Sequence, residues 1–265
     1  MRIPVVLTSV LIAGAVWAQD VTNIVAAGGC PDCRLRLMSL RDLHLPNADF
    51  QGTDLVEADL KGAMLSGARF VEANAQRAEF ERAMLAGSDF TDARLRDADF
   101  EKADLDGSRF DQADLRDADL ANSQMAQSRF VEADLRGAYL SRANAQGTDF
   151  TEARLDRADL ERAELAGAQF VDVTLVGADL DRAEAVGTSF ANADMSRVRL
   201  SSANLSGADL RGANLEDALM RRTRLNGADL STAEGLTEDQ LALACGDAKT
   251  KLPEGMSIRT CNADD

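Results

Sequence analysis

The sequence predicts an all-β solenoid of square cross-section, built from four five-residue units per coil. Three observations predict it. A large apolar residue, or in three places Ala, occupies every fifth position of residues 47–232 without a slip of register. A column of Ala, Ser and Thr, broken only by Val173 and Val198, lies two residues before each of these centres. Eight phenylalanines also repeat at intervals of twenty residues: Phe50, Phe70, Phe90, Phe110, Phe130, Phe150, Phe170 and Phe190.

Neither a helix nor a long strand can use a period of five. In a helix, successive centres would lie about 140° apart around the axis, so no apolar stripe would form. In a long strand, every second centre would point to the wrong face. A very short strand followed by a turn keeps each centre and its small neighbour on the inner side. A short unit that cannot bury its own face, repeated at a fixed period, is typical of a solenoid.

The interval of twenty residues sets the number of units in one coil. Four units per coil stack the eight phenylalanines into one ladder and place Phe80 and Phe100 on the opposite face. Glycines follow the same interval at Gly67, Gly87, Gly107, Gly147, Gly167, Gly187, Gly207 and Gly227. Such a column predicts a corner with positive φ, as in a type II turn. We expect about nine to ten coils and a rod about 45 Å long.

Size exchanges along the chain agree with a closed core. Ala75 lies between Phe70 and Phe80, and Ala185 accompanies the larger Val173. Because a packed interior conserves volume, a large residue at one position requires a small one nearby.

The repeated unit has the form A-D/N-L/F-x-x, as in residues 58–62 (ADLKG) and 208–212 (ADLRG). This pattern resembles the pentapeptide-repeat family over residues 47–232. The resemblance implies a right-handed quadrilateral β-helix. It implies little about function, since most members of the family have no known activity.

Residues 1–18 are predicted to be a secretory signal peptide. Arg2 precedes an apolar run from Ile3 to Ala15, and Val16 and Ala18 offer small side chains at the positions that a signal peptidase reads. The run is too short to span a bilayer comfortably, although a retained membrane anchor is the alternative. Cleavage before Gln19 would yield an exported protein, periplasmic or extracellular, with no membrane attachment.

Residues 19–46 are expected to form an N-terminal segment and an irregular first coil that begins near Cys30. Leu35, Leu40 and Leu45 already keep the register of the centres, and Pro46 precedes the regular repeats. A capped end matters because an open coil exposes unpaired backbone groups that would promote aggregation.

Cys30 and Cys33 form a C-x-x-C motif with three functional interpretations. A redox dithiol is disfavoured because no βαβ pattern surrounds it. Haem attachment would need His at position 34, where Arg34 stands. A metal site would need further ligands, and the other two cysteines lie at the far end of the rod. The remaining interpretation is structural, as a local disulfide or as buried thiols.

Residues 233–265 are expected to form a C-terminal cap. Thr237 to Gln240 read as a capping box, with Leu236 and Leu241 as a hydrophobic staple. The helix should run from residue 238 to about 244 across the end of the last coil, with Gly246 as its stop.

Cys245 and Cys261 are the remaining cysteines. In an oxidising compartment we expect them to pair across a loop of about 16 residues, which would stabilise the fold by about 3 kcal/mol.

The sequence contains no candidate for catalysis. The solenoid is filled by its own side chains, and an enzyme needs polar groups that converge in a pocket. No glycine-rich phosphate loop, metal motif or nucleophile constellation occurs, and the single histidine, His44, is expected on the surface. We therefore predict no catalytic residues, cofactor, metal, small-molecule substrate or direct contact with nucleic acid.

Charged residues fall into columns with an interval of twenty residues, in a chain of net charge −16. The first acidic column is Glu72, Asp92, Glu132, Glu152 and Asp172, completed by Gln112 and Asn192. The second acidic column is Asp59, Glu79, Asp99, Asp119, Asp159 and Asp179, interrupted by Tyr139. The basic column, Arg82, Lys102, Arg142, Arg162 and Arg182, is expected to be neutralised by adjacent Glu81, Glu101, Glu161 and Asp181.

Two functional hypotheses follow. In the first, an exported rod acts as a structural or protein-interaction module and docks an unknown protein through the first acidic column. The alternative rests on a resemblance to the quinolone-resistance pentapeptide proteins, which mimic DNA and bind gyrase. The predicted signal peptide argues against that alternative, as does a register that leaves no room for a loop. An outward neutral ladder, Val71, Thr91, Val131, Thr151 and Val171, offers a surface for a homodimer, unless it reflects strand preference alone.

Overall fold

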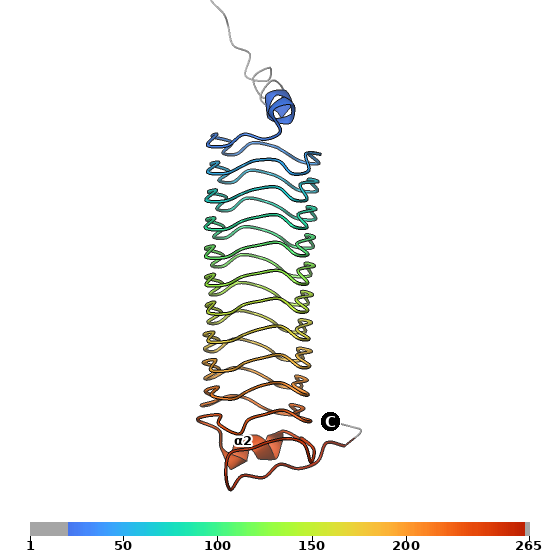
Figure 1. Ribbon diagram of the computed structural model, residues 1–265, viewed down its shortest axis with the longest axis vertical. Helices are drawn as coiled ribbons and strands as arrows, with labels where there is room; N and C mark the ends of the chain where they lie inside the picture. Colours follow the sequence, from blue (N-terminus) through green and yellow to red (C-terminus); the bar gives the residue numbers. More distant parts are fainter. Residues whose placement is uncertain (1–20, 263–265) are drawn as a thin grey trace, which may run out of the picture.

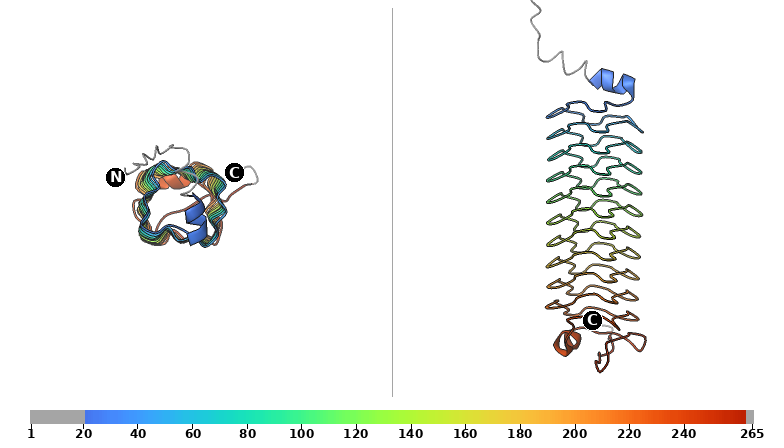
Figure 2. Two further views of the ribbon diagram at one scale, coloured as in Figure 1. Left: turned by 90° about the horizontal axis from the view of Figure 1, so that it is seen from above. Right: turned by 60° about the vertical axis from the view of Figure 1, so that its left-hand side comes forward.

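The computed structural model describes residues 21–262, which form a straight rod of stacked square coils (Figures 1 and 2). Parallel β-bridges join each bridge residue to the residue twenty positions later, from the pair Gly29 and Asp49 to the pair Asn214 and Glu234. Each side of a coil contributes one bridge residue, so the sheets consist of isolated bridges rather than long strands. The predicted period of twenty residues is therefore the register of the structure.

Four faces and four corners alternate along each coil, and we number them in chain order. In one coil the apolar centres of faces 1, 2, 3 and 4 are Phe70, Ala75, Phe80 and Leu85. Corners 1, 2, 3 and 4 follow them at residues 71–72, 76–77, 81–82 and 86–87. Adding or subtracting twenty gives the equivalent positions of the other coils.

The core is a continuous column of side chains along the axis of the rod. All eight phenylalanines of face 1 stack, with ring centroids 4.6 Å apart for Phe70 and Phe90 and 5.2 Å apart for Phe170 and Phe190. On face 3, Phe80 stacks on Phe100 at 4.7 Å, and both meet the face 1 rings edge-on, for example at 5.9 Å from Phe80 to Phe70. Both arrangements are favourable aromatic geometries. The predicted opposition of Phe80 and Phe100 to the long ladder is confirmed.

Positive φ extends to every corner, not only to the glycine column. From residue 32 to residue 227, the second corner residue has φ near +60° whether it is glycine, as Gly67 (+72°), or not, as Glu72 (+58°). Two hydrogen bonds impose this conformation. The Glu72 N–H donates to the Thr91 carbonyl of the next coil at 2.9 Å, and the Ala73 N–H donates back to the Phe70 carbonyl at 3.0 Å. The ladder thus holds residues in a conformation that costs a non-glycine side chain about 1–2 kcal/mol.

The N-terminal end is closed by a helix at residues 21–27, which lies over the first coil (Figure 1). Ile24 is its buried contact with the core, at 3% exposure. Residues 29–46, where we expected an irregular coil, make the same pairing as the rest, from the Gly29 to Asp49 bridge to the His44 to Met64 bridge. His44 is exposed. The predicted signal peptide, residues 1–18, lies outside the described residues.

The C-terminal end is covered by helix α2, Glu238–Leu243 (Figure 1). Its predicted capping box is confirmed: the Gln240 N–H donates to the Thr237 hydroxyl, and the Thr237 N–H donates to the Gln240 side chain at 2.8 Å. Leu241 is fully buried.

Gly246, however, does not end α2 as expected. The helix ends at Leu243, and its C-cap Ala244 is extended, because Cys245 returns to the ladder and accepts a hydrogen bond from the Leu225 N–H at 2.8 Å. The structure pairs Cys245 with Cys261, and Cys30 with Cys33. No helix of residues 21–262 is long and apolar enough to cross a membrane.

Candidate interaction surfaces

The first acidic column occupies corner 1. Its five carboxylates are all exposed, and their backbone φ angles lie between +56° and +60°. Two amides extend the column by hydrogen bonds, from Gln112 Nε2 to Glu132 at 2.9 Å and from Asn192 Nδ2 to Asp172 at 3.1 Å. Within residues 21–262, no Lys or Arg side chain forms an ion pair with any of the five. The column is therefore an exposed line of carboxylates that the rod itself leaves uncompensated.

Folding alone does not account for carboxylates at these positions. Corner 4 has the same geometry and carries glycine in most coils, for example Gly87 and Gly167. A carboxylate at such a corner strains the backbone relative to glycine. Like charges one coil apart also repel modestly. Both effects oppose stability. Side chains at corners 2 and 3 have the same positive φ, but only this acidic column combines it with full exposure and no cationic partner within residues 21–262, which makes it the strongest candidate for contact with another molecule.

The second acidic column lies on face 3 and is half-buried, apart from Tyr139, which is 53% exposed. Burial raises the pKa of Asp99, and the neighbouring Asp119 carboxylate raises it further. Burial and adjacent carboxylates raise the pKa of Asp179 in the same way. Cations compensate both ends, since Arg41 contacts Asp59 at 3.0 Å and Arg199 contacts Asp179 at 3.1 Å. This column is more enclosed and better compensated than the first.

The basic column at corner 3 is largely neutralised, as the sequence indicated. Arg82 contacts Glu81 at 2.7 Å and Lys102 contacts Glu101 at 2.6 Å. Glu161 accepts from Arg182 at 2.9 Å. We therefore do not assign this basic column as a binding site for anions.

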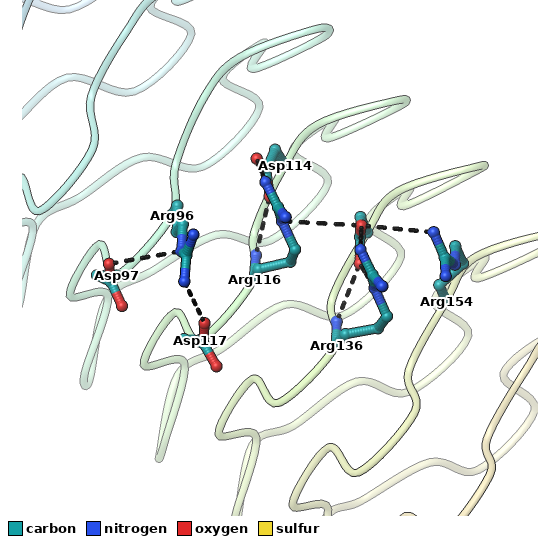
Figure 3. Close-up of polar contacts among 8 residues, drawn as sticks. Arg96, Asp97, Asp114, Arg116, Asp117, Arg136 and Arg154 are labelled. Atoms are coloured by element: carbon teal, nitrogen blue, oxygen red, sulfur yellow. Dashed lines mark hydrogen bonds and ion pairs between the residues drawn. The ribbon is translucent and has the colours of Figure 1, made fainter.

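An arginine and aspartate network on face 2 and corner 2 was missed by the sequence reasoning (Figure 3). Arg116 binds both oxygens of Asp114, at 2.7 and 2.6 Å, and Arg136 binds Asp134 with the same geometry. Arg154 of the next coil contacts Asp134 at 3.8 Å. The signal was present as the tripeptide Asp-Leu-Arg at 114–116 and 134–136. Its first and third side chains point outward together because the leucine between them points into the core.

This network stabilises the rod rather than offering free charge. The hydrogen bond from Arg116 lowers the pKa of Asp114. For Asp134, burial raises the pKa, but the hydrogen bonds from Arg136 outweigh burial and the net direction is downward. On the preceding coil, Arg96 contacts the adjacent Asp97 at 3.7 Å and reaches Asp117 of the next coil at 3.4 Å. Because each guanidinium already has a carboxylate, we do not assign this surface a ligand.

Two remaining predictions concern metal binding and the outward neutral ladder, which also lies at corner 1. The neutral ladder is half-buried, and the Thr91 and Thr151 hydroxyls donate to Asp89 and Asp149 at 2.6 Å. It therefore presents little flat apolar area. Within residues 21–262, no group of three or more His, Cys, Asp or Glu side chains could hold a metal ion.

Comparison with known proteins agrees with this geometry. A model of pentapeptide repeats in eight copies matches residues 33–72, 63–101, 163–201 and 199–233, and a model of a pentapeptide repeat region matches residues 93–170. The chain belongs to the pentapeptide-repeat family. Proteins of this family are in general structural or binding modules rather than enzymes.

Solved structures of pentapeptide-repeat proteins resemble the chain to different degrees. HetL from the cyanobacterium Nostoc, involved in heterocyst differentiation regulation, is 28% identical with a TM-score of 0.50, over 91% of this chain and 98% of HetL. QnrB1, a plasmid-mediated fluoroquinolone resistance protein, is 19% identical with a TM-score of 0.36, over 82% of this chain and 92% of QnrB1. No protein with curated annotation gives a significant match.

Proposed function

We propose that this chain is an exported, right-handed quadrilateral β-helix that acts as a protein-interaction module. Its first acidic column docks a partner protein with a basic surface. The observation that carries the proposal is the set of five exposed carboxylates without cationic partners, held at strained corner positions. A surface that opposes folding stability is retained more readily if it serves binding.

The spacing of the column suits a helical partner. Coils lie about 4.8 Å apart, while residues i and i+4 on one face of a helix lie about 5–6 Å apart. A helix with a basic stripe, aligned along the rod, can therefore meet successive carboxylates such as Glu132, Glu152 and Asp172. Electrostatic complementarity of this kind gives fast association and selects the partner.

Two features support export. Residues 1–18 have the composition of a signal peptide. All four cysteines are in disulfides, one disulfide at each end of the rod. Disulfides persist in oxidising compartments. The register is unbroken from residue 29 to residue 234, which leaves no inserted loop in that range and gives no support to the DNA-mimicry hypothesis.

Export is tested by fractionating the native cells and sequencing the N-terminus of the mature protein. We expect a chain that starts at Gln19 in the periplasm or the medium. A chain that retains Met1 in the cytoplasm would contradict export and would make a gyrase supercoiling assay the next experiment.

Partner docking is tested by site-specific photo-crosslinking in cells. We place p-benzoylphenylalanine at Gln112, within the column, and at Gln124 on face 4 as a matched control, since both glutamines are exposed. We expect one protein to cross-link at position 112 and not at position 124. Cross-linking of the same protein at both positions would contradict docking through corner 1.

The role of charge is tested in the protein that carries p-benzoylphenylalanine at position 112. Two sets of carboxylates are replaced there by the matching amides, Asp by Asn and Glu by Gln. The test set is Asp92, Glu132, Glu152 and Asp172. The control set lies on face 4 and corner 4 and likewise lacks ion pairs within the described residues: Asp104, Asp106, Glu164 and Glu184. We expect the cross-link to disappear in the test set and to persist in the control set. Equal cross-linking in both would refute the acidic column as the docking surface.

A further inference from the structure

The last coil leaves one strand edge uncovered, on face 3. Parallel bridges continue its other faces into the C-terminal tail, from Asn214 to Glu234 on face 2 and from Arg224 to Cys245 on face 4. On face 1, Asp229 continues to Lys251. Leu219, the bridge residue of face 3, pairs with Arg199 above it and with no residue below it in the described part of the chain.

The uncovered edge has free backbone donors. One coil earlier, the Leu200 N–H donates to the Leu219 carbonyl at 2.9 Å, and the Arg197 N–H donates to the Glu216 carbonyl at 2.7 Å. Among residues 21–262, the equivalent N–H groups of Met220 and Asp217 have no acceptor.

The residues that would form the next strand of face 3 belong instead to helix α2, which satisfies only part of this edge. The residue that would pair with Leu219 in the twenty-residue register is Asp239, which belongs to the helix. The side-chain amide of Gln240 donates to the carbonyls of Leu215 at 2.8 Å and Ala218 at 3.0 Å. At the end of α2, the Leu243 carbonyl accepts from the Arg222 N–H at 2.7 Å, but among residues 21–262 the helix supplies no acceptor for the N–H groups of Met220 and Asp217.

A groove of about 900 Å³ lies between this edge and α2, the helix labelled at the lower end of the rod in Figure 1. Leu219 and Leu243 line it and are 56% and 54% exposed. Glu216, Asp217, Glu234 and Asp239 also line it, and no Lys or Arg does. The groove thus combines two exposed leucines, an acidic rim and unpaired backbone donors.

We propose that this groove binds an extended, lysine-bearing or arginine-bearing segment of a partner protein, which adds as a strand to the edge at Leu219. The carbonyls of such a segment accept from the free N–H groups, as in other strand-addition complexes. Its apolar side chains pack on Leu219 and Leu243, and its cations meet the acidic rim. This surface is independent of the first acidic column, so neither proposal depends on the other.

The test uses a fluorescein-labelled octapeptide of alternating Lys and Val, with an alternating Glu and Val octapeptide as the control. Fluorescence polarisation with the intact protein is expected to show binding of the Lys-Val peptide alone. Replacing alternate backbone amides of that peptide by esters should weaken binding about tenfold, because an ester carbonyl accepts a hydrogen bond less well than an amide carbonyl. Failure of the Lys-Val peptide to bind, or equal binding by its ester-containing form, would overturn the proposal.

A pair of variants locates the binding and corrects for overall charge. Leu219→Lys places a cation in the groove and should weaken Lys-Val binding about tenfold. Tyr139→Lys is the control, since Tyr139 lies in the same face 3 column with a similar exposure of 53%. Backbone hydrogen exchange should slow at Met220 when the peptide binds. Equal loss in both variants would indicate general attraction to an acidic rod and would refute the site.

The same variant distinguishes a second copy of the chain from a foreign segment. If sedimentation shows a dimer that Leu219→Lys converts to a monomer, the occupant of the groove is another copy and the proposal in its present form is overturned. A monomer at all concentrations, with peptide binding as described, supports it.

Discussion

Substituting the first acidic column by glycine should stabilise the rod. Glu132, Glu152 and Asp172 have φ of +60°, +60° and +56°, in the left-handed region. That conformation costs a non-glycine residue about 1–2 kcal/mol, and the greater freedom of glycine in the unfolded chain offsets about 0.5–1 kcal/mol of the gain. Each substitution should therefore add about 0.5–1 kcal/mol, with a small further gain from reduced repulsion.

The reverse substitution provides a matched control. Gly167 has φ of +70°, and a Cβ added there would meet no atom within 4 Å. Gly167→Ala therefore introduces left-handed strain without a clash and should lower stability by about 1 kcal/mol.

Urea unfolding, followed by circular dichroism, measures both effects as shifts of the midpoint at unchanged slope. The triple glycine variant should unfold at higher urea than wild type, and Gly167→Ala at lower urea. If the triple variant were no more stable than wild type, the carboxylates would not oppose folding, and the reasoning that assigns them to binding would fail. If Gly167→Ala were neutral, the corner geometry would carry no strain.

Three further predictions address the core, the carboxylates and the cap. Phe110→Ala, in the middle of the stacked ladder and fully buried, should lower the unfolding free energy by about 3–5 kcal/mol; a loss below about 1 kcal/mol would contradict the packing. Asp99 has a raised pKa in the folded protein. Protonated Asp99 therefore favours folding below the unfolded pKa of about 3.9, and this stabilisation is lost as pH rises through the folded pKa. Asp99→Asn should raise the unfolding free energy at pH 7 and leave it unchanged in acid. Asp114 has a lowered pKa in the folded protein. Asp114→Asn should therefore lower the unfolding free energy at neutral pH, and the difference from wild type should disappear as pH falls through the folded pKa of Asp114. If the unfolding free energies of the Asp99 and Asp114 variants depended on pH in the same way, both pKa assignments would be refuted. Replacing Cys245 and Cys261 by Ser should cost about 3 kcal/mol, and hydrogen exchange should show the loss concentrated at the C-terminal cap rather than spread along the rod.

Much of the fold could be predicted because solenoid contacts follow a constant offset. Phe70 meets Phe90, and Asp59 pairs with Glu79, in the same twenty-residue register that the sequence displays. The acidic columns, the phenylalanine ladders and the α2 capping box depend on local or periodic relations and were therefore predictable.

Other features depend on the ladder as a whole. Positive φ at Glu72 or Arg82 is not a preference of Glu or Arg, and it follows from the hydrogen bond to the next coil. Asp-Leu-Arg could have indicated the pairs of Asp114 with Arg116, but the contact from Arg154 to Asp134 depends on side-chain rotamers across coils.

The sequence by itself determined the square coil, its inner column of centres and the positions of charge, since each follows from counting residues at a fixed interval. Only the tertiary structure decided what happens at the C-terminal end. There the tail returns to the ladder at offsets that no longer equal twenty, as in the bridges from Arg224 to Cys245 and from Asp229 to Lys251. Because the residues that would pair with this edge form α2 instead of a strand, Leu219 has no bridge partner below it in the described part of the chain, and no periodicity in the sequence could have indicated that gap.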